Sequence, residues 1–131
     1  MLSLGKGPIY LRSCKQKIVT RSSTEAELVA ISDALSQIIW GREFLKAQGI
    51  NCGPAILYQD NLSTMALVEK GRSTSDRTRH INVRYFFIKD KVTLGEIIVK
   101  HMRTDILPAD ILTKGVQGGA FIVKRKGIMN N

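Results

Sequence analysis

Three carboxylates stand at positions where predicted helices and strands begin or end. Glu27 falls in the first turn of a long amphipathic segment, Asp60 directly follows a short apolar run, and Asp110 comes two residues after Pro108. Mg²⁺ prefers carboxylate oxygens, and two such ions about 3.5–4 Å apart can promote cleavage of a phosphodiester. If the three acids converge, they therefore form a divalent-metal site with hydrolytic chemistry.

Each acid also has an ordinary structural explanation. Glu25 and Glu27 each stand three residues after a Ser or Thr, which is the pattern of a capping box. At about 100° per residue these two glutamates point roughly 200° apart, so they cannot share one role. Asp60 could cap the helix that follows it, and Asp110 could complement a helix dipole. The residues alone leave both explanations open.

Hydrophobic periodicity predicts the elements that must position these acids. The expected buried stripes are Leu28, Ile31, Leu35, Ile38 and Ile39 on a helix over 23–47, and Val83, Phe86, Phe87 and Val92 on a helix over 81–95. The other expected elements are extended segments at 7–13 and 15–22, strands at 55–59 and 96–102, a short helix at 61–70, a polar loop at 71–79, and a last helix beginning at Pro108. This order predicts an α/β fold in which helices pack on the faces of a mixed sheet.

The composition is that of a folded domain rather than a disordered, disulfide-rich or membrane-spanning chain. Its 131 residues are 44% hydrophobic, enough for one core. Cys14 and Cys52 are far apart and indicate neither a zinc site nor a disulfide framework. No apolar run approaches the roughly 18 residues that cross a bilayer, and the start of the chain lacks a signal-peptide pattern. We therefore expect an intracellular protein, cytoplasmic or nuclear, without a membrane partner.

Positive charge is concentrated in two places. Between residues 70 and 91 seven Lys or Arg stand against two Asp, and "KRK" follows at 124–126, within a net charge of +9. Such an excess makes a polyanion such as nucleic acid a candidate partner. A solvated basic surface is the alternative, and charge alone does not decide between them.

Four blocks of sequence carry a resemblance to a known family. "SCKQKIVTRSSTEAELVAISDA", "YQDN", "RTRHINVRYFFIKDKV" and "PADILTK" come in the order and at the distances found in the ribonuclease H domain that ends the polyprotein of copia-type retrotransposons. The chain resembles that domain over residues 5 to about 115, which implies a ribonuclease H-like domain at 1–114 and a basic C-terminal tail at 115–131. The resemblance implies a mixed sheet flanked by helices and hydrolysis of the RNA strand of RNA–DNA hybrids. The expected cofactor is Mg²⁺, two ions in the complete site, with Mn²⁺ as an alternative.

The resemblance also assigns roles to individual residues. The helix acid of the family falls on Glu27, the acid ending the central strand on Asp60, and the last-helix acid on Asp110, so these three are the expected catalytic and metal-binding residues. Glu25 is then left as the helix cap. Four residues of the basic block are candidates either for contact with backbone phosphate or for packing and surface charge: Arg77, Arg79, His80 and Arg84. His101, at a strand end, is interpreted as a surface residue outside the site.

One departure from the family bears on activity. The family's first catalytic aspartate lies on an opening strand upstream of the "SCKQK" match, whereas this chain has no acid among its first 24 residues. We therefore expect an N-terminally truncated copy that lacks the first strand and most of the second, with little or no nuclease activity unless another chain, such as the reverse transcriptase part of the parent polyprotein, completes it. The alternative is an inert retroelement remnant that acts at most as a basic nucleic-acid-binding module. An integrase-like strand transferase is disfavoured by the "RTRHINVRY" and "PADILTK" blocks.

Overall fold

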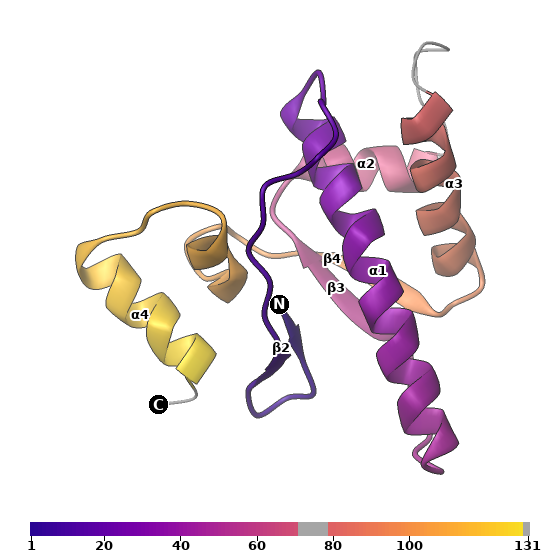
Figure 1. The fold of residues 1–131 in the computed structure, drawn as a ribbon, viewed down its shortest axis with the longest axis horizontal. Helices are drawn as coiled ribbons and strands as arrows, with labels where there is room; N and C mark the ends of the chain where they lie inside the picture. The colour runs from indigo at the N-terminus through magenta and orange to yellow at the C-terminus, as the bar shows by residue number, and fades with distance from the viewer. Residues whose placement is uncertain (71–78, 130–131) are drawn as a thin grey trace. The chain divides into compact units, whose positions relative to one another are not determined.

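A computed structural model describes residues 1–70 and 79–129, which divide into two compact units (Figure 1). One unit is Ile18–His101, and the other combines Met1–Lys17 with Met102–Asn131. Both helices and strands are present, so the predicted mixture of α and β structure is confirmed, while the specific ribonuclease H-like arrangement stays a prediction. No helix among the described residues has the length and apolar character needed to span a bilayer.

The unit Ile18–His101 is built on a parallel pair of strands. Strand β3 (Ala55–Gln59) lies beside β4 (Ile97–His101), with the register running from Ala55 opposite Ile97 to Gln59 opposite His101. The helices of this unit are α1 (Ser23–Ala47), α2 (Leu62–Lys70) and α3 (Arg79–Thr93). These elements confirm the helices predicted at 23–47, 61–70 and 81–95 and the strands predicted at 55–59 and 96–102. The loop predicted at 71–79 lies almost wholly outside the described residues.

The core of this unit lies between the helices and one face of the strand pair. Leu28 and Leu35 of α1, Tyr85 and Ile88 of α3, and Ile97 of β4 are fully buried. On the strand pair burial alternates as a pleated sheet requires: Ile56, Tyr58 and Ile98 point to the other face and are exposed. The stripe predicted on α1 is confirmed, with Ile31 and Ile38 also buried.

The buried face predicted for α3 is wrong. Val83 and Phe86 are 70% and 62% exposed, whereas Ile81, Tyr85 and Ile88 are buried. Both sets follow helical spacing, since the second runs i, i+4, i+7, so α3 is apolar on two sides. Periodicity therefore predicts the helix but does not select the side that packs.

Ser22 and Glu25 cap the start of helix α1 in a variant of the capping box. The Ser22 hydroxyl accepts a hydrogen bond from the Glu25 N–H at 3.2 Å, and the Glu25 carboxylate reaches back to the Arg21 N–H at 2.7 Å. Thr24 lies within the helix, so the alternative box with Glu27 does not form. Glu25 is thus the capping acid, and Glu27 is left without that role.

The other unit contains a hairpin and two helical segments. Strand β1 (Leu2–Ser3) pairs antiparallel with β2 (Pro8–Tyr10), which confirms part of the extended segment predicted at 7–13. No strand forms at 15–22, contrary to expectation. The last predicted helix is a short 3₁₀ turn, η1 (Pro108–Leu112), and a further helix, α4 (Gly118–Met129), forms in the segment expected to be a tail. The domain boundary at residue 114 stays a prediction.

Candidate functional site

At the carboxyl end of β3, one residue links the side chain of Glu27 to the backbone of Asp60. Gln59, the last residue of the strand, is 5% exposed, and its Nε2 donates a hydrogen bond to Oε2 of Glu27 at 3.1 Å. Its Oε1 accepts hydrogen bonds from the backbone N–H groups of Asp60, at 2.7 Å, and Asn61, at 3.1 Å. One side-chain amide thus separates the Glu27 carboxylate from the backbone of Asp60. We call Glu27, Gln59 and Asp60 the acidic corner.

The orientation of the Gln59 amide follows from its partners. Only the carbonyl oxygen of the amide can accept hydrogen bonds from two backbone N–H groups, and only its NH₂ group can donate a hydrogen bond to a carboxylate. The opposite flip would place donor against donor and acceptor against acceptor. The acidic corner therefore has one satisfied hydrogen-bonding arrangement, which joins α1 to the end of β3.

Asp60 is not the cap of α2. The side-chain oxygen of Asn61 accepts a hydrogen bond from the N–H of Thr64 at 3.1 Å, which makes Asn61 the capping residue. Thr64 is fully buried, and its hydroxyl donates to the carbonyl of Thr24 at 3.5 Å, so the start of α2 packs against the start of α1. The ordinary explanations for Glu27 and Asp60 as capping residues are therefore both wrong.

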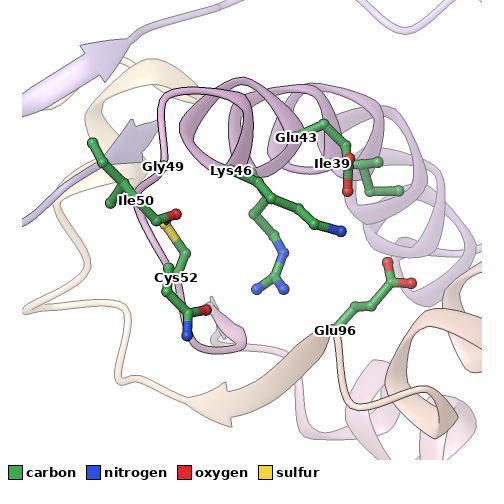
Figure 2. A pocket seen from close by; sticks show the side chains of 9 residues that line it. Ile39, Glu43, Lys46, Gly49, Ile50, Cys52 and Glu96 are labelled. Carbon is green, nitrogen blue, oxygen red and sulfur yellow. Dashed lines mark hydrogen bonds between the residues drawn. The ribbon is translucent and has the colours of Figure 1, made fainter.

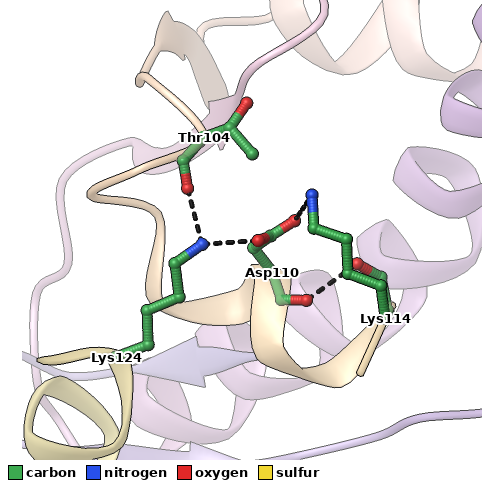
Figure 3. A network of polar contacts seen from close by, with 5 residues as sticks. Thr104, Asp110, Lys114 and Lys124 are labelled. Carbon is green, nitrogen blue, oxygen red and sulfur yellow. Dashed lines mark hydrogen bonds and ion pairs between the residues drawn. The ribbon is translucent and has the colours of Figure 1, made fainter. Parts of the chain in front are cut away.

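Asp110 belongs to the other unit and is engaged by lysines (Figure 3). The residue is 7% exposed in η1, and its Oδ1 pairs with Nζ of Lys114 at 2.8 Å. Its Oδ2 pairs with Nζ of Lys124, a 7%-exposed residue of α4 that also donates to the carbonyl of Thr104 at 2.8 Å. Asp110 thus ties α4 to η1, a role that no helix dipole explains.

The charge state of Asp110 follows from these contacts. Burial by itself would raise the pKa of the Asp110 carboxyl, but hydrogen bonds and positive charges from Lys114 and Lys124 outweigh it, so the pKa lies below its usual value. Asp110 is therefore ionised at neutral pH, with an ammonium group beside each carboxylate oxygen.

The predicted phosphate-contacting residues are only partly described. Arg77 lies outside the described residues, as do the side chains of Arg79 and His80. Arg84 is half-buried, and its Nη1 forms an ion pair and hydrogen bond with Oδ1 of Asp33, which joins α3 to α1. A nucleic-acid phosphate would have to compete with Asp33 for this guanidinium.

Two polar residues near these acids were not assigned a role from the sequence. Gln59 carries one available signal, since it is the single polar residue of an apolar strand and directly precedes Asp60. Lys124 carries none, because nothing in "KRK" separates the buried Lys124 from its exposed neighbours. His101 ends β4 opposite Gln59 and is exposed, so it shares the edge at which β3 ends.

The donors suit a hard cation in part. Glu27 and Asp60 both carry carboxylate oxygens, the ligand type that Mg²⁺ prefers. Both oxygens of Asp110 instead face lysine ammonium groups. Across residues 1–70 and 79–129, no three His, Cys, Asp or Glu side chains are grouped so as to hold a metal ion. A metal ion at the acidic corner, and Asp110 as a further ligand, therefore stay predictions.

An open hollow of about 480 Å³ lies elsewhere in the unit Ile18–His101 (Figure 2). It is bordered by the last turns of α1, by the loop Gly49–Cys52, and by Glu96 immediately before β4. This is the amino end of β4, whereas Asp60 follows the carboxyl end of β3. Its charged side chains balance, with Arg42 and Lys46 against Glu43 and Glu96, and none of the predicted site residues lines it.

Comparison with known proteins gives matches along nearly the whole chain. It is 34% identical over 121 residues to the retrovirus-related Pol polyprotein from transposon TNT 1-94 of Nicotiana tabacum. It is 38% identical over 119 residues to the Pol polyproteins from transposons RE1 and RE2 of Arabidopsis thaliana. These alignments cover 90–92% of the chain but only 8–9% of the relatives, so the chain spans under a tenth of their length.

Two other comparisons give nothing further, since no protein-family model matches the chain and no solved structure matches it significantly. The Pol matches extend well beyond the four sequence blocks and run along both units. The acidic corner and the Asp110 cluster thus both lie in a chain that is homologous to a segment of retrovirus-related Pol polyproteins from plant transposons.

Proposed function

We propose that this chain is the ribonuclease H segment of a copia-type retrotransposon polyprotein, acting on the RNA strand of RNA–DNA hybrids with Mg²⁺. The observation that carries the proposal is the acidic corner, in which Gln59 joins the Glu27 carboxylate to the strand end that bears Asp60. Similarity to Pol polyproteins supports it, because hydrolysis of the RNA strand is a reaction that reverse transcription requires.

The proposed site residues have different roles in this reaction. Glu27 and Asp60 would bind the cation through carboxylate oxygens at the carboxyl end of β3. Bound Mg²⁺ supplies activation of a water and neutralisation of the charge that develops on the leaving oxygen. Asp110 is the third proposed ligand, and it can serve only when Lys114 and Lys124 release its oxygens.

The resemblance assigns a fourth acid to a strand upstream of the matched blocks, and residues 1–24 carry no Asp or Glu. We therefore propose that the nuclease activity needs that strand, supplied by an upstream segment of the polyprotein or by another chain. In its absence the proposed function reduces to cation and hybrid binding at the same corner. Mg²⁺ binding is thus the property that tests the site in the 131-residue chain itself.

The test combines binding and cleavage. Mg²⁺ titration of the chain, followed by NMR shifts of the backbone amides of residues 27 and 60, should saturate in the unsubstituted protein and should weaken at least tenfold in Asp60→Asn. The matched control is Asp90→Asn, on the exposed side of α3. Cleavage of a labelled RNA–DNA hybrid is then measured with the upstream coding sequence included. Cleavage or Mg²⁺ binding that survives Asp60→Asn would refute the site.

A second function has its own support. The chain carries a net charge of +9, and Asp110 is already neutralised by lysines, as suits a basic module without catalysis. Such a remnant would bind hybrid, duplex DNA and duplex RNA through phosphate contacts and would leave all three intact. Binding that is unaffected by Mg²⁺ and by Asp60→Asn, without cleavage, would select this function over the nuclease.

A further inference from the structure

We propose that Gln59 is the positioning residue of the acidic corner: its side-chain amide holds the Glu27 carboxylate and the backbone at Asp60 in the arrangement that receives the cation. This inference rests on the proposed function, since it concerns how this chain prepares the same site. Gln59 itself is not a proposed ligand.

The first argument is that every polar atom of the Gln59 side chain is used within the corner. Nε2 donates to Oε2 of Glu27 at 3.1 Å, and Oε1 accepts from the N–H groups of Asp60 and Asn61 at 2.7 and 3.1 Å. The side chain is almost fully buried, so water does not compete for these bonds. The rotamer of Gln59 is therefore fixed, and through it the positions of its neighbours.

The second argument concerns the span between two elements. Glu27 belongs to α1 and Asp60 follows β3, 33 residues later in the chain. If the two carboxylates turn toward a shared cation site, they repel each other until a cation arrives. A neutral amide that donates to one partner and accepts from the backbone of the other opposes their separation. Gln59 therefore keeps the corner assembled before any cation arrives.

The third argument is that the side chain at this position must be both long enough and a neutral amide. Asn would keep the amide but is one methylene shorter than the span from β3 to Glu27. Glu would keep the acceptor for the two N–H groups but would place a negative charge against Glu27. Met has nearly the same length and volume but makes none of the three hydrogen bonds, so Gln59→Met removes the function with the least change in packing.

The experiment uses the full chain with Gln59→Met and, as matched control, Gln37→Met on α1. NMR titration with Mg²⁺ should show an affinity about 10–100-fold lower for Gln59→Met, the loss that residues supporting metal ligands typically cause. Gln37→Met should bind Mg²⁺ as the unsubstituted chain does. A readout without metal accompanies it: amide hydrogen exchange at Asp60 and Asn61 should accelerate in Gln59→Met alone.

The possible outcomes distinguish an error in the role of Gln59 from an error in the proposed function. If Glu27→Gln and Asp60→Asn abolish Mg²⁺ binding while Gln59→Met leaves affinity and exchange unchanged, the role of Gln59 is wrong and the proposed function stands. If Glu27→Gln and Asp60→Asn leave binding unchanged, or the unsubstituted chain binds no Mg²⁺, the proposed function is wrong. The inference about Gln59, which rests on it, is then wrong as well. Should Gln59→Met not fold, judged by circular dichroism, Gln59→Asn is measured instead and is expected to lose affinity as well.

Discussion

Asp110 and Lys124 form a buried ion pair, and the effect of such a pair on stability differs from that of a surface pair. Each side chain is at most 8% exposed, and removal of one partner from such a pair commonly costs about 3–5 kcal/mol because the other charge is left uncompensated. Lys114 offers Asp110 a second partner, although that lysine is largely exposed and adds less. The pair therefore stabilises the packing of α4 on η1, and its strength depends on the ionisation of Asp110.

Acid should weaken this unit through Asp110. Its pKa is lower in the folded chain than in the unfolded chain, so the stabilisation is complete above the ordinary Asp value of about 3.9 and is lost as pH falls through the folded pKa. The measurement is urea unfolding of the unsubstituted chain and of Asp110→Asn, which cannot ionise, between pH 7 and pH 2. The difference between the two free energies of unfolding should be constant near neutrality and should shrink in the acid range. A difference that persists unchanged to pH 2 would contradict the ion-pair role.

For individual residues, the sequence predicted which acids are candidates for a site but not which side chains contact them. Glu27 and Asp60 were selected from their places at element ends, and Gln59 links the Glu27 carboxylate to the backbone N–H of Asp60, while a shared metal site of the two acids stays a prediction. The lysine contacts of Asp110 were not predictable, because Lys124 reaches it from a helix that begins eight residues later and was not expected. Tertiary contacts of this kind leave no periodic trace in the sequence.

Helices and strands with a clear period were predicted well, and those that depend on tertiary contacts were not. The α1 stripe and the apolar run of β3 each have one interpretation, whereas α3 has two apolar sides and gave the wrong face. Helix α4 forms despite three glycines, and Gly127 packs on the ring of Pro108, where a Cβ atom would be in ordinary van der Waals contact with Cγ at 3.6 Å. Its contacts with η1, rather than helix propensity, therefore account for it.

The start of α2 allows the capping role to be separated from the proposed ligand role. Asn61→Ala removes the side-chain oxygen that accepts the Thr64 N–H, so it should lower the free energy of unfolding by about 1 kcal/mol. Ser63→Ala, at the exposed second position of the same helix, is the control and should change stability by less than about 0.5 kcal/mol. Urea unfolding measures both. Equal effects of the two substitutions would mean that Asn61 does not cap α2.

In the whole molecule, the proposed cation site and the exposed basic residues of α4 belong to different parts of the chain. The acidic corner lies in the unit Ile18–His101, where Arg84 is already paired with Asp33. On α4, in contrast, Arg125 and Lys126 are exposed while the adjacent Lys124 is buried against Asp110. Three consecutive basic residues thus have two different roles. Attraction of a polyanion is expected from the exposed pair and not from Lys124.

Salt dependence of hybrid binding tests this division of charge. The logarithm of the binding constant should fall linearly with the logarithm of salt concentration, by about 0.7–0.9 for each phosphate contact. Arg125→Ala combined with Lys126→Ala should weaken binding to an RNA–DNA hybrid and make the slope shallower by about one to two. Asp60→Asn should leave the slope unchanged, because its side chain is expected to meet a cation rather than release counterions from the backbone. A slope unaffected by the α4 substitutions would remove Arg125 and Lys126 from the nucleic-acid surface.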